Sequence, residues 1–486
     1  MNSSRGRHAT PLDIACVLAR HASRHISSIL EPAVGTGILL QPLIERLKKS
    51  AKQIVCIDSD PNALSIVRKT LGKTFHNSLQ LVSEDFLKWS ERFLAKKGKS
   101  FDCVLMNPPF SGRRGLLVRL ELDRPSRTIS KTVGYVPIEV AFVIRGVKLL
   151  KPGGRLLAIV PSSLVSSSGA SWVRNYLLSI GFVRFVHELP RFTFKDVEAR
   201  VYLFVFEKGT TQGSLTLCNH DLYKPEKLVM PISRLNHEAR FDYSFNQARL
   251  WLQDIRSKFP SLEWTELKNV AFLYRGSEES PDGPKNAIHT CDWNDGFWDS
   301  ENQREGLKQG NGDRCIKRGD LLVRRVGRSC VQSLGPIRGY LNHACSDCIY
   351  LIRPNPAIAS SELLFALRIL VACSKGAALV ERGTGATYIT EQALLELPVP
   401  TALRLIFGRE FKSYLMALRR KDPHAMRSIE KKTRHILTNK TEKVLGKRKS
   451  SGTISRRPAN LLLAPHNTTS RNLPRPVKET KIESFV

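Results

Sequence analysis

Short apolar runs alternate with amphipathic stretches over the first 210 residues of the chain. The clearest runs end near residues 30, 58, 82, 106 and 206, and each has the length of a buried strand. Strands that alternate with helices predict an α/β domain with a mostly parallel, doubly wound, Rossmann-like sheet. We expect this domain to occupy residues 1–210.

The alternation stops after residue 210, and residues 211–403 are predicted to form a second domain of α+β type. Its first part is rich in Gly, Asn, Asp and Trp, which favours loops. A strand pattern with several arginines follows at residues 317–328. Residues 404–486 are predicted to be a basic helical segment with a disordered tail rich in Ser, Pro, Arg and Asn.

Four residues that follow the apolar run ending at Met106 carry the most informative chemistry. They are Asn107, Pro108, Pro109 and Phe110. The prolines end the strand, because they cannot donate hydrogen bonds to a neighbouring strand. An amide oxygen and a proline carbonyl can both accept from one exocyclic amine, and the Phe110 ring can stack on a base, which is worth about 1–3 kcal/mol. This turn is therefore predicted to bind a flat heterocycle that bears an amine.

Other strand ends carry residues that are typical of a nucleotide site. A Gly-x-Gly turn at Gly35 and Gly37 follows the first strand and allows a ligand to approach the backbone closely. Asp58 ends the second strand, where an acid can accept from ribose hydroxyls, and Asp60 is a rival for that role. The third strand is followed by Asp85 and Phe86, which can bind an adenine ring.

Together these motifs resemble those of S-adenosylmethionine-dependent DNA adenine-N6 methyltransferases. The resemblance implies a cofactor motif at Glu31, Pro32, Ala33, Gly35 and Gly37, and a Thr-Pro element at Thr10 near the methionine end of S-adenosyl-L-methionine. The resemblance implies that Asp58 binds the ribose and that Asp85 and Phe86 bind the cofactor adenine. It assigns catalysis to Asn107 and the three residues after it. Because the cofactor motif comes first, the catalytic motif second and the recognition domain last, the order is that of the gamma class.

Later residues are expected to bind the nucleic acid. In the resembled family a loop aromatic faces the target base from the other side, and Phe194 fits best, with Phe192 as the rival. The basic residues that follow the proposed base pocket are expected to bind phosphates, and they are Arg113, Arg114, Arg119, Arg124, Arg127 and Lys131. Residues 319–322, 383–387 and 397–400 resemble target-recognition domains of restriction–modification proteins, and Arg324 and Arg325 are the arginines expected to contact DNA there.

The net charge of +32 indicates a polyanionic partner, with nucleic acid as the first candidate. Ten scattered cysteines are interpreted as reduced thiols, and no metal site is expected. No apolar run is long enough to cross a membrane without charges. We therefore expect a cytoplasmic monomer, nucleoid-associated when bound to double-stranded DNA, and the resemblance allows for a separate restriction endonuclease as a partner.

The interpretation is a site-specific methyltransferase acting on the N6 amine of a flipped adenine. Three alternatives stay open at this point. Cytosine-N4 also offers an exocyclic amine, although that motif usually begins with Ser, and Asn-Pro-Pro enzymes can act on RNA adenines or on a protein glutamine. A non-catalytic DNA-binding specificity protein is the third, and the intact Gly35, Gly37, Asp58 and Asn107 argue against it.

Overall fold

The computed structural model describes most of residues 10–441. The ranges left out within that span are 24, 48–50, 97, 99, 111–115, 123–131, 191–192, 195–199, 210–212, 232–239, 277–286, 300–311, 340 and 384–386. Residue contacts divide the chain into one unit of residues 1–441 and another of 442–486, and the second unit lies outside the described residues. The expected disordered tail falls there.

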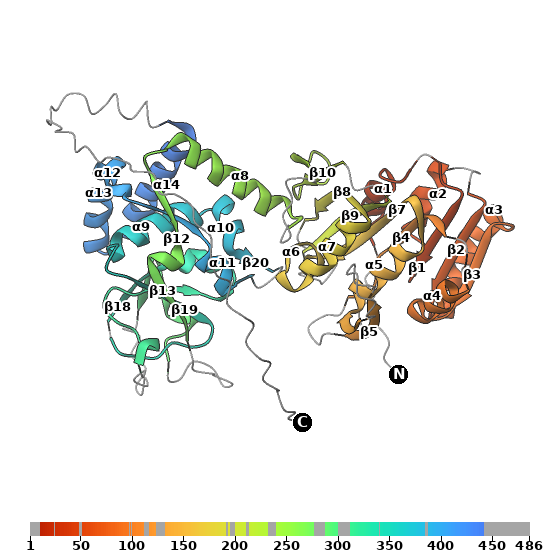
Figure 1. Cartoon of the computed structure of the whole chain (residues 1–486), viewed down its shortest axis with the longest axis horizontal. Coiled ribbons are helices and arrows are strands. Elements are labelled where there is room, and N and C mark those ends of the chain that lie inside the picture. Colours follow the sequence, from red (N-terminus) through yellow and green to blue (C-terminus); the bar gives the residue numbers. More distant parts are fainter. Residues whose placement is uncertain are drawn as a thin grey trace, which may run out of the picture. The chain divides into compact units, whose positions relative to one another are not determined.

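A nine-stranded sheet organises the first half of the chain (Figure 1). Its strand order is β11-β10-β8-β9-β7-β4-β1-β2-β3, and all neighbours are parallel except those that involve β9 and β11. The strands are β1 Ser28–Pro32, β2 Gln53–Asp58, β3 Leu79–Ser83, β4 Phe101–Met106, β7 Leu150–Pro161, β8 Gly181–Glu188, β9 Val201–Lys208, β10 Ser214–Cys218 and β11 Lys227–Pro231. This topology confirms the predicted doubly wound α/β domain.

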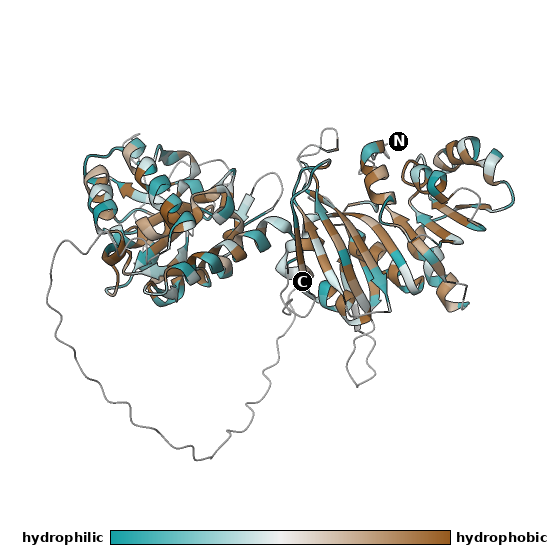
Figure 2. Ribbon diagram, turned by 90° about the horizontal axis from the view of Figure 1, so that it is seen from above, coloured by the Kyte–Doolittle hydropathy of each residue, from teal (hydrophilic) through white to brown (hydrophobic). Residues whose placement is uncertain are grey.

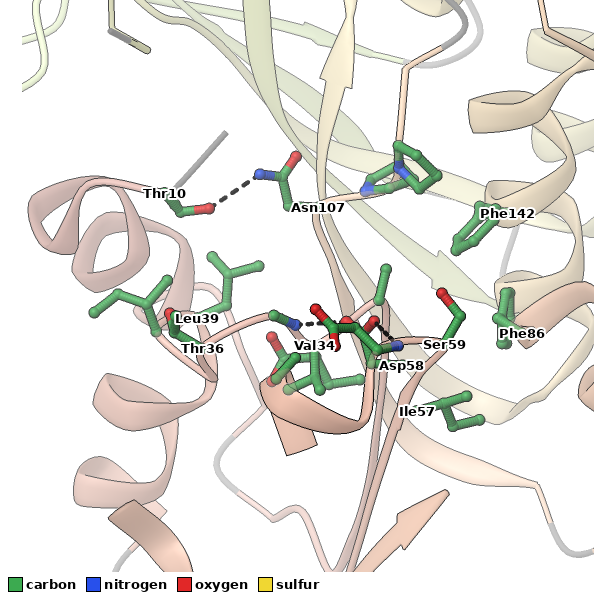
Figure 3. A pocket seen from close by; sticks show the side chains of 18 of the residues that line it. Thr10, Val34, Thr36, Leu39, Ile57, Asp58, Ser59, Phe86, Asn107 and Phe142 are labelled. Carbon is green, nitrogen blue, oxygen red and sulfur yellow. Dashed lines mark hydrogen bonds between the residues drawn. The ribbon is translucent and has the colours of Figure 1, made fainter. Parts of the chain in front are cut away.

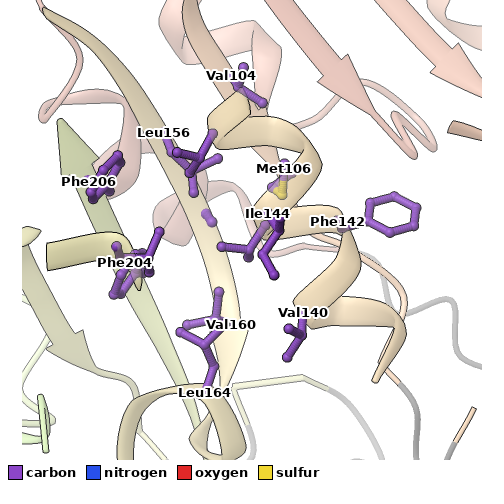
Figure 4. Close-up of a cluster of buried hydrophobic side chains, with 14 of the residues drawn as sticks. Val104, Met106, Val140, Phe142, Ile144, Leu156, Val160, Leu164, Phe204 and Phe206 are labelled. Atoms are coloured by element: carbon purple, nitrogen blue, oxygen red, sulfur yellow. The ribbon is translucent and has the colours of Figure 1, made fainter. Parts of the chain in front are cut away.

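Both faces of this sheet are buried, as expected of parallel strands. Alternate residues of one strand go to opposite faces, so Cys103 and Leu105 of β4 join one apolar cluster and Val104 and Met106 join the other. Figure 4 shows the second cluster, where β4, β7 and β9 meet α5. The principal helices that cover the sheet are α1 Leu12–Ala19, α2 Leu40–Leu47, α3 Pro61–Phe75, α4 Phe86–Ala95, α5 Ile138–Lys148 and α7 Ser171–Ile180. In Figure 2 the strands are predominantly brown, the hydrophobic end of the scale.

The central sheet continues beyond residue 210, where the sequence pattern placed the domain boundary. β10 pairs in parallel with β8, and β11 pairs with β10. Both strands are five residues long, and β11 alternates intermediate and exposed residues, so their apolar signal is weak. The sheet therefore ends at Pro231, and the boundary near 210 does not coincide with its last strand.

A separate hairpin is inserted between β4 and α5. It consists of β5 Leu117–Leu122 and β6 Thr132–Pro137, which pair only with each other in the described part of the chain. Leu120 and Val136 are buried with the residues under α5. The hairpin is thus held to the domain by one of its two faces.

The second region combines a small sheet with helices. Helix α8 Tyr243–Lys258 precedes a six-stranded sheet of order β13-β19-β16-β18-β15-β14. Its strands are β13 Ala271–Arg275, β14 Trp293–Asn294, β15 Phe297–Asp299, β16 Leu321–Arg324, β18 Gly335–Arg338 and β19 Ile349–Pro354. Smaller sheets pair β12 Glu263–Glu266 with β22 Pro398–Thr401 and join β17 Val326–Gly327, β20 Glu381–Arg382 and β21 Thr387–Ile389. The α+β class expected for residues 211–403 is present in this region.

Helices beyond residue 403 pack onto this region. They are α12 Leu403–Ile406, α13 Gly408–Arg419 and α14 Pro423–Asn439. Arg368 of the apolar helix α9 Ser360–Val371 is buried and forms an ion pair with Glu430 of α14. Among the described residues no single helix is long and apolar enough to span a membrane, and α9 passes that test only together with α10 Ser374–Val380, from which it is bent by 104°.

Candidate functional site

The carboxyl ends of β1, β2 and β4 meet at a pocket of about 550 Å³ (Figure 3). This is the edge at which open parallel sheets bind ligands, and the volume lies in the usual range for small-molecule sites. The strand-end motifs are far apart in the sequence, and the sheet order brings them together. Of the predicted residues, these line the pocket: Thr10, Glu31, Ala33, Gly35, Asp58, Asp85, Phe86, Asn107, Pro108, Pro109, Phe110 and Phe194.

The turn after β1 adopts a left-handed backbone at several positions. Gly35 has φ +54° and Gly37 has φ +76°, which glycine tolerates, but Ala33 also has a positive φ of 53°. A Cβ built on Gly35 would meet no protein atom within 4 Å, whereas one on Gly37 would lie 3.3 Å from Cγ2 of Val67. Gly35 therefore leaves open space beside the pocket, and Gly37 allows the turn to pack on α3.

Two predicted cofactor residues do not line the pocket. Pro32 is the buried last residue of β1, and Gly37 is held inside the turn by a 2.9 Å hydrogen bond from its amide to the Val34 carbonyl. Both residues set the course of the backbone into the turn. Their role in the structure is to shape the turn.

Asp58 is anchored to the glycine turn. Its carboxylate accepts from the Gly35 amide and from the Asp60 amide, both at 2.9 Å, and the residue is 6% exposed. The rival Asp60 also lines the pocket, but its carboxylate accepts from the Asn62 amide and caps α3. Because Asp58 joins the end of β2 to the turn after β1, it holds the two ligand-facing segments in register.

Asp85 and Phe86 stand at the start of α4. The Asp85 carboxylate accepts from the Lys88 amide at 3.0 Å, so it caps the helix and faces the pocket at the same time. Phe86 is buried, with its ring centroid 4.9 Å from that of Phe142 on α5. This corner of the pocket presents an acid next to aromatic faces, as an adenine ring would require.

Glu31 is a buried acid with an unused hydrogen-bond acceptor. It is 2% exposed, and its Oε2 atom has no hydrogen-bond partner among the described residues. Burial, and secondly the charge of Asp58, raise the pKa of the Glu31 carboxyl well above its usual range. A cationic group in the pocket would stabilise the ionised form of this carboxyl.

Asn107 is oriented by a residue that lies 97 positions earlier. Its amide nitrogen donates to the Thr10 hydroxyl at 3.0 Å, and Figure 3 shows the amide oxygen on the opposite side from Thr10. No donor among the described residues bonds to that oxygen. The amide therefore presents a free acceptor, which is the chemistry expected for holding an amine.

Aromatic and proline residues complete the region around Asn107. Pro108, Pro109, Phe110 and Phe194 line the same pocket, and Phe194 is 4% exposed. Phe192, the rival of Phe194, lies outside the described residues, as do Arg113 and Arg114. The choice between the two phenylalanines stays a prediction, as does phosphate binding by the two arginines.

Arg324 and Arg325 are not part of the pocket. The Arg324 guanidinium donates to the Thr290 carbonyl at 2.7 and 3.0 Å. The Arg325 guanidinium donates to the Asp347 carbonyl at 2.6 Å and pairs with the carboxylate of the same residue. Both arginines therefore hold protein segments together, and their contact with DNA stays a prediction.

The sequence interpretation missed some pocket residues. Ile138 and Phe142 of α5 line the pocket, although the sequence shows only an apolar helix there. Nor does any local signal link Thr10 to Asn107, or mark Ala33 as a left-handed residue. In the described ranges no group of three or more His, Cys, Asp or Glu residues could hold a metal ion, and all ten cysteines are free thiols.

Comparisons with known proteins find similarity to DNA methylases over the first half of the chain. Residues 1–235 match the model of the N-6 DNA methylase family. Modification methylase CviBIII of Paramecium bursaria Chlorella virus NC1A is 28% identical over 200 residues, which are 40% of this chain and 48% of that protein. Type II methyltransferase M.AccI of Acinetobacter calcoaceticus is 20% identical over 245 residues, which are 49% of this chain and 41% of that protein.

The chain thus spans about half the length of the curated relatives it matches. Among solved structures, the type IIG restriction endonuclease BpuSI aligns over 90% of this chain and 67% of its own, with a TM-score of 0.43 and 13% identity. The pocket and every residue that lines it lie inside the range that the family model matches. The similarity to N-6 DNA methylases therefore covers the part of the chain that forms the pocket.

Proposed function

We propose that the protein transfers a methyl group from S-adenosyl-L-methionine to the N6 amine of adenine in double-stranded DNA. The observation that carries the proposal is the position of Asn107. Its free amide oxygen lies in one continuous pocket with the glycine turn and the acids of β1 and β2. A site for an amine and a site for a nucleotide are thus joined, as a transfer between them requires.

The residues present fit S-adenosyl-L-methionine as the cofactor. The unpartnered Glu31 carboxyl suits a cationic group, Asp58 is placed for a ribose, and Asp85 with Phe86 suits an adenine. The open space at Gly35 gives the ligand room beside the backbone. When bound, the cofactor supplies an electrophilic methyl group on a sulfonium.

In this proposal the Asn107 amide oxygen and the Pro108 carbonyl accept hydrogen bonds from the two N–H groups of the target amine. Their pull turns the nitrogen lone pair towards the methyl group, and Phe110 and Phe194 hold the ring from its two faces. Because an adenine inside a duplex is stacked and paired, the base must first be flipped out at a cost of a few kcal/mol. Most of the acceleration then comes from orientation.

The gamma-class assignment, recognition by residues 211–403, a monomeric state and a separate endonuclease belong to the proposal as well. Their support is the order of the motifs and the resemblance of the later segments to target-recognition domains. The cytosine-N4, RNA-adenine, protein-glutamine and non-catalytic alternatives predict different products. The experiment must therefore identify the methylated molecule.

The test is methyl transfer from tritium-labelled S-adenosyl-L-methionine to DNA, RNA and protein, offered separately to the full chain. We expect label in DNA as N6-methyladenine, and sequencing of modified bases in DNA from an expressing host should reveal the site. Label in cytosine, RNA or protein would replace the proposed substrate. No label in any of them, with cofactor binding intact, would favour the non-catalytic alternative.

A further inference from the structure

The hairpin β5–β6 is flanked in the sequence by two residues that line the pocket. Phe110 lies seven positions before β5, Ile138 follows β6 directly, and both line the pocket. The Ile138 amide donates to the Leu116 carbonyl at 3.1 Å, which ties the two ends of the insertion together. The base of the hairpin is therefore anchored next to Ile138, a residue that lines the pocket.

The two faces of the hairpin differ sharply in exposure. Leu120 and Val136, on the inner face, are 3% and 4% exposed. On the outer face Leu117 is 53% exposed and Tyr135 is 73% exposed. Arg119 is directly opposite Tyr135 in the strand pairing and is also exposed, so an arginine and a tyrosine leave the same face of the hairpin from paired positions.

We propose that this outer face contacts the DNA duplex beside the target adenine, and that Tyr135 stacks on the bases adjoining the position that the flipped adenine leaves. The inference rests on the proposed function, because it needs a duplex whose base enters the pocket. It adds a stacking residue, Tyr135, that was not among the predicted site residues.

Charge and chemistry favour DNA as the occupant of this face. The chain has a net charge of +32. The outer face also carries the exposed Glu121, but the arginine directly opposite Tyr135 combines attraction to phosphate with a ring that stacks on bases. Flipping an adenine unstacks its neighbours, which costs a few kcal/mol. A ring that fills the gap offsets part of that cost, and Tyr135 lies three residues before Ile138, which lines the pocket.

The test compares Tyr135→Ala and Tyr135→Phe with a control, Tyr223→Ala. Tyr223 is 81% exposed and lies between β10 and β11, so it matches Tyr135 in exposure but does not belong to the hairpin. Each full-length variant is titrated with a duplex that contains the methylation site and with one that carries 2-aminopurine at the target position. Cofactor affinity and thermal unfolding are measured on each variant as checks of folding.

We expect Tyr135→Ala to bind the site about tenfold more weakly and to lose most of the 2-aminopurine signal. Tyr135→Phe keeps the ring and should behave as the wild type, and so should Tyr223→Ala. On a duplex with a mismatch at the target, where flipping costs less, the defect of Tyr135→Ala should shrink. Arg119→Gln should reduce the salt dependence of binding by about one counterion.

Equal binding and equal signal for Tyr135→Ala and Tyr223→Ala would overturn the proposal while leaving the proposed function intact. Loss of self-association in Tyr135→Ala, with DNA binding unchanged, would assign the face to a second copy of the chain and would also overturn it. A wild type that methylates no DNA adenine, with its cofactor bound, would instead refute the proposed function.

Discussion

Two polar side chains of the pocket and four arginines of the second region differ in how fully other groups of the protein bind them. In the pocket, Glu31 Oε2 and the Asn107 amide oxygen have no partner among the described residues. In the second region, the Arg353 guanidinium binds both oxygens of Asp320, and Arg368 binds both oxygens of Glu430. Arg324 and Arg325 are likewise bonded to neighbouring segments.

This difference separates two uses of polar residues that look alike in a sequence. A buried polar group without a partner is costly, and a ligand that bonds to such a group in the pocket would offset that cost. An arginine with several hydrogen bonds to other parts of the protein stabilises the packing of loops and strands. Unused hydrogen-bonding capacity, rather than residue type, therefore distinguishes Glu31 and Asn107 from Arg324 and Arg325.

The largest effect should follow from Asn107→Ala. The change removes the free acceptor, and we expect methyl transfer to fall about 100-fold or more because the amine is no longer held. The loss should appear in kcat, with the affinities for cofactor and DNA largely unchanged. Single-turnover kinetics with equilibrium binding would measure this. Residual activity within about threefold of the wild type would refute the assignment of Asn107.

Gly35→Ala should weaken cofactor binding about tenfold or more. No protein atom occupies the space that the new methyl group enters, and in the proposal the cofactor fills that space. Gly153→Ala is the matched control. Gly153 has φ +75°, and a Cβ built on it would also meet no atom within 4 Å, but it lies in β7 away from the pocket. Both variants carry the strain of a left-handed alanine, so equal affinities measured by calorimetry would show that no ligand lies near Gly35.

Thr10→Val should lower kcat about tenfold, because the loss of one hydrogen bond allows the Asn107 amide group to rotate away from its orientation. Thr10→Ser retains the hydroxyl and should restore the rate. The resemblance instead gives Thr10 a contact with the cofactor, and that role predicts a higher KM for S-adenosyl-L-methionine at unchanged kcat. Steady-state kinetics on both variants separates orientation of Asn107 from cofactor contact.

Phe194→Leu should reduce base flipping by a few-fold, because a stacking face worth about 1–3 kcal/mol is removed. Phe204→Leu, in the apolar cluster of the opposite sheet face, is a control of similar burial that should lose similar stability without losing flipping. Fluorescence of 2-aminopurine at the target position reports the difference. A signal lost in Phe192→Ala but kept in Phe194→Leu would assign the stacking role to Phe192.

Much of the fold and the pocket could be predicted because both follow from local patterns and a general rule of topology. Buried strands are short apolar runs, and parallel strands bring their carboxyl ends to one edge, so Asp58, Asp85 and Asn107 had to converge. The bond from Asn107 to Thr10 could not be predicted, because nothing local links residues 97 positions apart. The strands β10 and β11 were missed because edge strands alternate weakly and bury little.

The smallest effect on activity should come from a substitution of Arg324. This substitution tests whether an arginine with internal hydrogen bonds has only a structural role. Arg324→Gln removes hydrogen bonds to the Thr290 carbonyl, so we expect a loss of about 1–3 kcal/mol in the free energy of unfolding. The ratio of specific to random DNA binding should not change. The sequence interpretation predicts the reverse, a change in the preferred sequence, since an arginine on guanine gives about 1–3 kcal/mol of discrimination.

A competition between specific and random duplexes at several salt concentrations decides between the two. Neutralising Arg113 and Arg114 in the same assay should weaken binding equally for all sequences, and should lower the salt slope by about one for each phosphate that is no longer bound. If Arg324→Gln unfolds like the wild type yet alters the ratio, its guanidinium reaches a base edge. Hydrogen bonds within the protein would then not distinguish structural from functional arginines. The contrast between the pocket side chains and these arginines would not hold.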